Sequence, residues 1–385
     1  MRGDVNIAHC IHGLGLGGAQ KVIKAIVQGG GAGDFRHFVY SPQDGVLREE
    51  IEHAGALVRI LPRRLPKLDP FWVFALAGAM RIDRIDVVHT HLFGDSLHGY
   101  LAARLAGGIP VVMTLHIGAE GQTRLQRLGY RWLLGRTTHN IACTTSVGRS
   151  WSYVRRDVQV IPNGIEVPAT TGGGGLTAQD AKARLGIGAD TQVIGAIGRL
   201  VEQKGFDVLI SAFARVANAR DNHVRLVFIG DGPLRAELRR QAESDGVGHL
   251  VVFAGFRSDV ADLLPAFDVV AFSSNFEGLP IALLEAMAAG RCIVGTDAPG
   301  IVDAVSAESE ALIVPIGDVA ALSAALVRAL TDAELRQRLG EAARQRFVCE
   351  FTAERMVASY ETVYRELCHR VAAPPTPVIS ERRIP

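Results

Sequence analysis

Short runs of β-branched and other apolar residues alternate with helix-length amphipathic segments along nearly the whole chain, in two successive series. The runs lack the polar alternation of half-exposed strands, which indicates parallel strands covered by helices on both faces. We therefore predict an α/β fold with two doubly wound parallel-sheet domains. The expected strands are residues 5–11, 37–40, 57–61, 87–91, 111–116, 140–143 and 158–161, then 192–197, 225–229, 251–254, 269–272, 293–296 and 311–314.

The boundary between the two series is predicted near residue 168. Asn163-Gly164 follows the last strand of the first series, and the stretch 167–175 (VPATTGGGG) contains four glycines, as a linker does. The predicted domains are residues 1–168 and 169–352. We expect a helix at 353–371 that packs back toward the N-terminal domain, and a disordered proline-rich tail at 372–385.

Charge and composition exclude several classes of protein. The chain has 41 Lys+Arg and 40 Asp+Glu, and this balance argues against a protein that coats nucleic acid. Residues 1–165 nevertheless carry a net charge of +7 and the rest −6, so we expect the first half to face an anionic partner. The most apolar window, 70–80, has 11 residues, whereas a membrane crossing needs about 20. The chain begins with a strand pattern instead of an export signal, and its five cysteines form no CxxC pair, so we expect a soluble cytoplasmic protein with free thiols.

A glycine-rich turn, GLGLGGAQ at residues 13–20, follows the first expected strand and opens a helix. It matches the spacing G-x-G-x-x-G, but a dinucleotide site also needs an acidic residue at the end of the second strand. That strand ends in Tyr40-Ser41-Pro42 with no acid, so we do not expect NAD. Two interpretations remain, an anion site made by backbone N–H groups at a helix start and a simple tight turn.

Two further motifs place charged residues at expected strand ends of the second series. In GRLVEQKG, residues 198–205, Arg199 and Lys204 stand in a glycine-bounded turn and suit two linked phosphates, although a solvated loop would carry similar charges. In EGLPIALLEAMAAG, residues 277–290, Glu277 lies before a helix and Glu285 in its second turn. The two carboxylates can bind hydroxyl groups of one ligand, with phosphates at the helix start between them. The alternative is a capping acid and a surface acid, but Glu285 lies among apolar residues and needs a partner.

Together with GDGP at 230–233, these motifs resemble the sequence pattern of family 4 retaining glycosyltransferases of the GT-B fold, over about residues 5–365. The resemblance implies two Rossmann-like domains with an interdomain cleft, a nucleotide diphosphate sugar, expected to be a UDP-sugar, as co-substrate, and no cofactor and no metal. It implies retaining transfer of a hexose or N-acetylhexosamine to a glycan or lipid-linked glycan of the cell envelope or an exopolysaccharide.

The resemblance also implies residue roles. Arg199 and Lys204 would neutralise the donor diphosphate, Glu277 would hold sugar hydroxyls, Glu285 the ribose, and His116 would lie beside the transferred sugar. The implied catalytic residues are His116, Arg199, Lys204 and Glu277. The implied donor-binding residues are Gly17, Gly18, Arg199, Lys204, Gly232, Phe256, Arg257, Gly278, Leu279, Ile281 and Glu285, and the acceptor-side residues are Gln20, His91 and His116.

The sequence departs from the family pattern mainly at Ile117, where the family often has Asp after the histidine, and this puts acceptor contacts in doubt. His89 and His91 share one strand face and could bind a metal, but no third ligand is evident in the sequence.

Acceptor and alternative functions are less constrained. On one expected helix, three arginines share a face beside three apolar residues: Arg124, Arg127 and Arg131 beside Leu125, Leu128 and Trp132. This pattern suits peripheral contact with an anionic membrane or a lipid-linked diphosphate. In the alternative interpretation, the arginines form a solvated face and the leucines belong to the core. A nucleotide-sugar epimerase or a phosphorylase would have a similar two-domain build, and a catalytically silent carbohydrate-binding or scaffold protein is an alternative of a different class. The charged motifs favour a transferase over all three.

Overall fold

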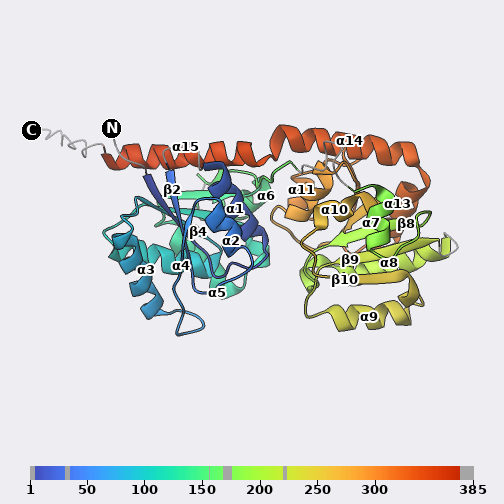
Figure 1. Cartoon of the computed structure of the whole chain (residues 1–385), viewed down its shortest axis with the longest axis horizontal. Helices are drawn as coiled ribbons and strands as arrows, with labels where there is room; N and C mark the ends of the chain where they lie inside the picture. Colours follow the sequence, from blue (N-terminus) through green and yellow to red (C-terminus); the bar gives the residue numbers. More distant parts are fainter. Residues whose placement is uncertain (1–4, 31–34, 156, 168–175, 220–222, 373–385) are drawn as a thin grey trace, which may run out of the picture. The chain divides into compact units, whose positions relative to one another are not determined.

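The computed structural model describes residues 5–30, 35–155, 157–167, 176–219 and 223–372 of the chain (Figure 1). Two β-sheets are present, one from each predicted series. The first contains β1 (Val5–Cys10), β2 (Phe35–Ser41), β3 (Leu57–Ile60), β4 (Val87–His91), β5 (Val111–Leu115), β6 (His139–Ala142) and β7 (Gln159–Val160). The second contains β8 (Gln192–Ile197), β9 (Val224–Ile229), β10 (Val251–Gly255), β11 (Val269–Phe272), β12 (Cys292–Thr296) and β13 (Ala311–Val314).

Helices connect successive strands in both sheets. Those between the strands of the first sheet are α1 (Gly18–Gly30), α2 (Arg48–His53), α3 (Pro70–Ile82), α4 (Phe93–Leu105), α5 (Arg124–Leu134) and α6 (Thr145–Ser150). The later helices are α7 (Ala178–Arg184), α8 (Phe206–Ala219), α9 (Arg235–Ser244), α10 (Val260–Leu263), α11 (Ile281–Ala288), α12 (Pro299–Val302), α13 (Val319–Thr331), α14 (Ala333–Glu350) and α15 (Ala353–Ala372). Short 3₁₀ turns include η1 (Ala119–Gly121) and η3 (Glu202–Lys204).

The strand orders are β3-β2-β1-β4-β5-β6-β7 and β10-β9-β8-β11-β12-β13. The described pairings, which include β1 with β2 and β4 and β8 with β9 and β11, are parallel. This confirms the predicted α/β class with two doubly wound sheets. The strand order reverses between β1 and β4 and between β8 and β11, and ligands of such sheets bind beyond the carboxyl ends of the strands at these switch points. The glycine-rich turn follows β1, Arg199 follows β8 and Glu277 follows β11, so the motifs lie where the fold places ligands.

Helix α3 explains the most apolar window of the sequence. Asp69 caps its start by accepting hydrogen bonds from the backbone N–H groups of Phe71 and Trp72, and Pro70 occupies the first turn. Trp72, Leu76 and Met80 are buried in the core, whereas Phe71 and Phe74 are exposed. Within the described residues, no helix combines the length and the apolar character needed to cross a membrane.

The described residues form two compact units. One comprises those within 5–114, 132–140 and 357–372, and the other comprises those within 115–131 and 141–356. Helix α15 therefore belongs to the first unit from Val357 onward, where Val357 lies against Gly29 of α1 and Tyr364 lies edge-on to Phe35. The predicted hinge at residue 168 and the tail 373–385 lie outside the described residues, so the boundary and the disorder remain predictions.

Candidate active site

The loop that follows β8 positions Lys204. After Gly198 the chain makes the 3₁₀ turn η3, and Gly205 ends it with φ +56°, a left-handed conformation that favours glycine. A Cβ atom at Gly205 would lie 2.2 Å from the carbonyl oxygen of Ser273, so the turn packs directly against the loop after β11. Ser273 also donates a hydrogen bond to the Lys204 carbonyl at 2.8 Å. The two motif loops are thereby held side by side, by close backbone packing at Gly205 and by the Ser273 hydroxyl.

Lys204 and Glu277 form a largely buried ion pair. The Lys204 Nζ–Glu277 Oε1 distance is 2.6 Å, and the side chains are 15% and 6% exposed. Ser274 Oγ donates to the same carboxylate oxygen at 2.7 Å, and Gln203 Nε2 donates to Oε2 at 3.2 Å. Three donors on one carboxylate fix its orientation and compensate for its loss of water. The sequence predicted both residues as catalytic, and the structure brings them into contact.

His116 lies against the same loop. It follows β5, and a Cβ atom at Gly278 would lie 1.7 Å from the His116 carbonyl oxygen, so only glycine allows this close approach. The thiol of Cys143 also donates to that carbonyl, at 3.5 Å. Desolvation through partial burial lowers the pKa of His116 to about 4. The imidazole is therefore neutral at physiological pH, so a role of His116 in a reaction would depend on hydrogen bonds or contact and not on a positive charge.

The start of α11 separates the two predicted carboxylates. Glu277 stays in the loop and Glu285 lies in the second turn of α11, partly buried, as the sequence predicted. Pro280 is the N-cap residue of α11, one position before the first helical residue. The side chains of Leu279 and Ile281 are buried, so their contribution to a donor site would come from the backbone.

Three predicted donor-binding residues line other strand ends of the second sheet. Gly232, after β9, packs on the loop after β8, because a Cβ atom there would lie 2.4 Å from the Leu200 carbonyl oxygen. Phe256 follows β10 and is exposed, as expected for a ring on which a base can stack. The Arg257 guanidinium is held by two hydrogen bonds to Asp259, at 2.7 and 2.6 Å. Arg199 is exposed at the end of β8.

The glycine-rich turn lies in the first compact unit. Gln20 is buried and its side-chain amide donates to the Gly13 carbonyl at 3.0 Å, while a Cβ atom at Gly17 would lie 2.3 Å from the Gln20 oxygen. Gln20, which was predicted to face the acceptor, therefore stabilises the turn through this hydrogen bond. Gly18 is the first residue of α1. His91, also predicted on the acceptor side, is completely buried in β4.

A charged cluster at the end of β1 was missed by the sequence reasoning. Asp95, in the first turn of α4, is buried and accepts hydrogen bonds from the His12 backbone at 3.0 Å and the His12 ring at 3.3 Å. Arg63 donates to its other oxygen at 3.2 Å. The hydrogen bond to Asp95 raises the pKa of His12, which is half exposed beside the glycine-rich turn. The sequence signal that could have indicated this cluster is an acidic residue, Asp95, shortly after the expected strand 87–91.

Comparison with known proteins agrees with this arrangement. Residues 16–167 match the family model described as Glycosyltransferase Family 4, and residues 178–346 match Glycosyl transferases group 1. The chain is 31% identical to the 2-deoxystreptamine N-acetyl-D-glucosaminyltransferase of Streptomyces fradiae, over 78% of this chain and 79% of that protein. It is 28% identical to the UDP-Gal:alpha-D-GlcNAc-diphosphoundecaprenol alpha-1,3-galactosyltransferase of Escherichia coli, over 77% and 79%.

Solved structures show the same fold. The crystal structure of Anabaena HepE in complex with UDP and glucose matches 94% of this chain and all of that chain with a TM-score of 0.84, at 20% identity. WaaG, a glycosyltransferase involved in lipopolysaccharide biosynthesis, matches 93% and 99% with a TM-score of 0.73, at 18% identity. From its motifs, its two sheets and these matches, we conclude that the chain belongs to the family 4 glycosyltransferases of the GT-B fold.

Proposed function

We propose that the protein transfers a hexose or N-acetylhexosamine, with retention of configuration, from a nucleotide diphosphate sugar to a glycan or lipid-linked glycan in cell-envelope or exopolysaccharide synthesis. The observation that carries the proposal is the buried Lys204–Glu277 pair in a loop that touches the His116 backbone. The names of the relatives above support a sugar donor. UDP is named in the donor of the Escherichia coli galactosyltransferase and is bound in the Anabaena HepE structure, which favours UDP as the nucleotide.

In this proposal the cations of the loop after β8 stabilise the leaving diphosphate. Arg199 offers a planar fork of donors to phosphate oxygens, and Lys204 offers a point charge already positioned by Glu277. Donors held in place where negative charge develops contribute most to catalysis, and the loss of one costs about 2.7–4 kcal/mol. Two cations and the start of α11 can supply the charge that a divalent ion supplies elsewhere, so we propose transfer without a metal.

Glu277 is proposed as a positioning residue for sugar hydroxyls. Its carboxylate accepts from Lys204, Ser274 and Gln203, which lowers its reactivity toward an anomeric carbon. Retention would then come from a donor phosphate oxygen that takes the acceptor proton on the face the diphosphate leaves. Glu285 would bind the ribose, and Gly17 and Gly18 would approach the diphosphate from the first domain.

The first experiment is a thermal-shift screen of UDP-, GDP- and ADP-sugars against the full chain. A donor at 100 times its dissociation constant adds about 2.7 kcal/mol of stability, which a melting curve detects. Release of UDP from the selected donor, measured with and without acceptor and with EDTA, then tests transfer and metal independence. Proton NMR of the product gives the anomeric configuration; inversion would refute the retaining mechanism.

A second experiment addresses the role of Glu277. Glu277→Ala should reduce turnover by about 100-fold or more, and mass spectrometry of the parent enzyme should detect no glycosyl adduct during turnover. A trapped adduct would make Glu277 or a neighbour a nucleophile. Binding of a donor without any turnover or release of nucleotide would favour a silent carbohydrate-binding protein.

Helix α5 supports a contact with an anionic lipid surface. Arg124, Arg127 and Arg131 are exposed, and the neighbouring Leu125 and Leu128 are 75% and 63% exposed, so these leucines are not core residues. A helix with exposed leucines beside arginines suits the surface of an anionic membrane. We propose a cytoplasmic protein that binds the inner membrane face peripherally, near a lipid-linked acceptor.

The membrane proposal is tested by sedimentation with vesicles that contain anionic phospholipid. Binding should be present at low salt, should fall as salt is added, and should weaken in Leu125→Ser/Leu128→Ser. The matched control is Ile82→Ser, which removes an exposed apolar residue from the end of α3. Equal binding by neutral vesicles, or no binding at low salt, would contradict the proposal.

A further inference from the structure

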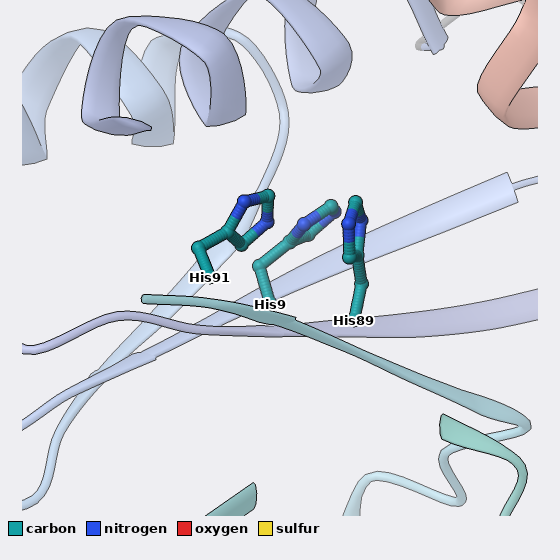
Figure 2. Close-up of side chains that lie close together, drawn as sticks. All are labelled: His9, His89 and His91. Carbon is teal, nitrogen blue, oxygen red and sulfur yellow. The ribbon is translucent and has the colours of Figure 1, made fainter. Parts of the chain in front are cut away.

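Four histidines gather on one face of the first sheet. His9 lies on β1, His37 on β2, and His89 and His91 on β4. His9 stands opposite His89 in the β1–β4 register, and His91 is two residues further, so its side chain leaves the sheet on the same side. Figure 2 shows the His9, His89 and His91 side chains on that side, with their rings grouped together. All three are completely buried.

The three rings are close enough to share one ion. One ring nitrogen from each of His9, His89 and His91 lies within 4.8 Å of the others, and the ring centroids are 4.1 to 5.8 Å apart. Zinc–nitrogen distances of about 2.0–2.1 Å in a tetrahedral site place the nitrogens about 3.4 Å apart, so small ring rotations would complete the site. The third ligand that the sequence did not reveal is His9, which lies 80 residues before His89 and reaches it by strand pairing.

The surroundings have the character of a metal site. His9 Nε2 is 3.1 Å from His37 Nδ1. The buried Nδ1 of His9 and Nε2 of His37 have no hydrogen-bond partner among the residues that the structure describes. A buried imidazole nitrogen without a partner is costly, and a metal ion would compensate for it at His9.

Hydroxyl groups surround the rings. His89 Nδ1 is 2.7 Å from the Tyr364 hydroxyl and His89 Nε2 is 2.8 Å from Thr114 Oγ1. To bind an ion, one of these two nitrogens would give up its hydroxyl partner. The other would keep its hydrogen bond, which commonly fixes the ring of a metal-binding histidine. Tyr364 belongs to α15, so the site would join β1, β4 and the returning C-terminal helix.

We propose that His9, His89 and His91 bind one divalent transition-metal ion of the zinc class. Three imidazole ligands favour zinc, cobalt, nickel or copper over magnesium or calcium, which prefer oxygen. The ion is structural: it stabilises the packing of α15 on the sheet and takes no part in the transfer proposed above, which stays independent of added metal.

The test uses the full chain and cobalt as the probe, because tetrahedral cobalt with nitrogen ligands absorbs visible light. Since the site is buried, cobalt is supplied both during expression in a defined medium and during refolding from denaturant that contains a chelator. We expect one cobalt per chain by mass spectrometry of the metal, visible absorption bands, displacement by zinc, and X-ray absorption that reports about three imidazole ligands. No stoichiometric cobalt by either route would overturn the proposal, whatever the variants do.

Two variants complete the test. Loss of a hydrogen-bond partner of a metal ligand typically lowers metal affinity by roughly 10–100-fold. His91→Asn removes a ligand itself and should lower the cobalt affinity by more than that, and circular dichroism checks that the variant is folded. His53→Asn, which removes an exposed histidine at the end of α2, should bind as the wild type does. Full cobalt affinity in folded His91→Asn, or loss of the bound ion in His53→Asn, would assign the metal to another site and refute the proposal.

Discussion

Removing the Lys204 ammonium alone should destabilise the protein more than removing the Lys204 and Glu277 charges together. In Lys204→Met the carboxylate of Glu277, 6% exposed, keeps only its bonds from Ser274 and Gln203. A buried charge that loses its partner typically costs about 3–5 kcal/mol. Adding Glu277→Gln removes that charge at almost unchanged volume and leaves mainly a lost hydrogen bond, worth about 0.5–1.5 kcal/mol.

The double variant should therefore be more stable than Lys204→Met by about 1.5–4.5 kcal/mol. For a domain of about 150–250 residues, this corresponds to a melting temperature about 3–18 °C higher. Activity should not recover with it, because both variants lack the cation that we propose to face the donor diphosphate. Each variant should lose about 100- to 1000-fold in kcat.

Scanning calorimetry of the two variants, of Glu277→Gln and of the wild type gives the stability cycle, and nucleotide release gives the activity. A double variant that melts at or below Lys204→Met would refute the reasoning, because it would mean that the two charges do not compensate each other. Recovered activity in the double variant would show that Lys204 serves only to neutralise Glu277.

Three further predictions follow from single contacts. Burial lowers the pKa of His116 to about 4 from 6.5, so its contribution to stability is complete above pH 6.5 and is lost as the pH falls toward 4. Between these pH values the free energy of unfolding, measured with denaturant, should fall by up to about 3 kcal/mol more in the wild type than in His116→Gln. Equal pH slopes for the two proteins would exclude a neutral His116. Gly278→Ala should lower the melting temperature and kcat, because its Cβ atom would lie 1.7 Å from a backbone oxygen. The control Gly78→Ala, in an open position of α3, should raise the free energy of unfolding by about 0.5–1 kcal/mol. A Gly278→Ala variant with unchanged melting temperature and kcat would contradict the close approach. Asp95→Asn should move the pKa of His12 down toward its ordinary value in an NMR titration, and no movement would show that Asp95 is not its cause.

Strand and helix positions could be predicted because they depend on local pattern. Uninterrupted apolar runs occur only where both sheet faces are covered, and the two series gave both sheets nearly to the residue, as in β8 (Gln192–Ile197) and β11 (Val269–Phe272). The motif residues followed, since parallel sheets place ligands at strand ends. Lys204 and Glu277 are 73 residues apart, yet they were both selected because each ends a neighbouring strand.

Contacts between strands and helices could not be predicted in the same way. His9 and His37 are single histidines in apolar strands, and only the pairing of β1 with β2 and β4 brings them beside His89. The exposure of Leu125 and Leu128 depends on whether another element covers α5, which its own periodicity does not encode. His91, predicted at the acceptor, is buried because it still belongs to β4. Each of these depends on tertiary neighbours.

Three glycines of the motifs have a physical role beyond the one that the sequence suggested. The sequence placed Gly205 in a glycine-bounded turn and Gly232 and Gly278 among the donor-binding residues. In each case a Cβ atom would collide with a backbone carbonyl of another loop. These glycines bring loops from β5, β8, β9 and β11 together, and the Lys204–Glu277 pair forms where they meet. Backbone contacts of this kind hold the two charged side chains in defined positions, and charges that are already positioned lower a barrier without reorganisation. A variant that separates these backbones should therefore impair catalysis even where every charged side chain is retained.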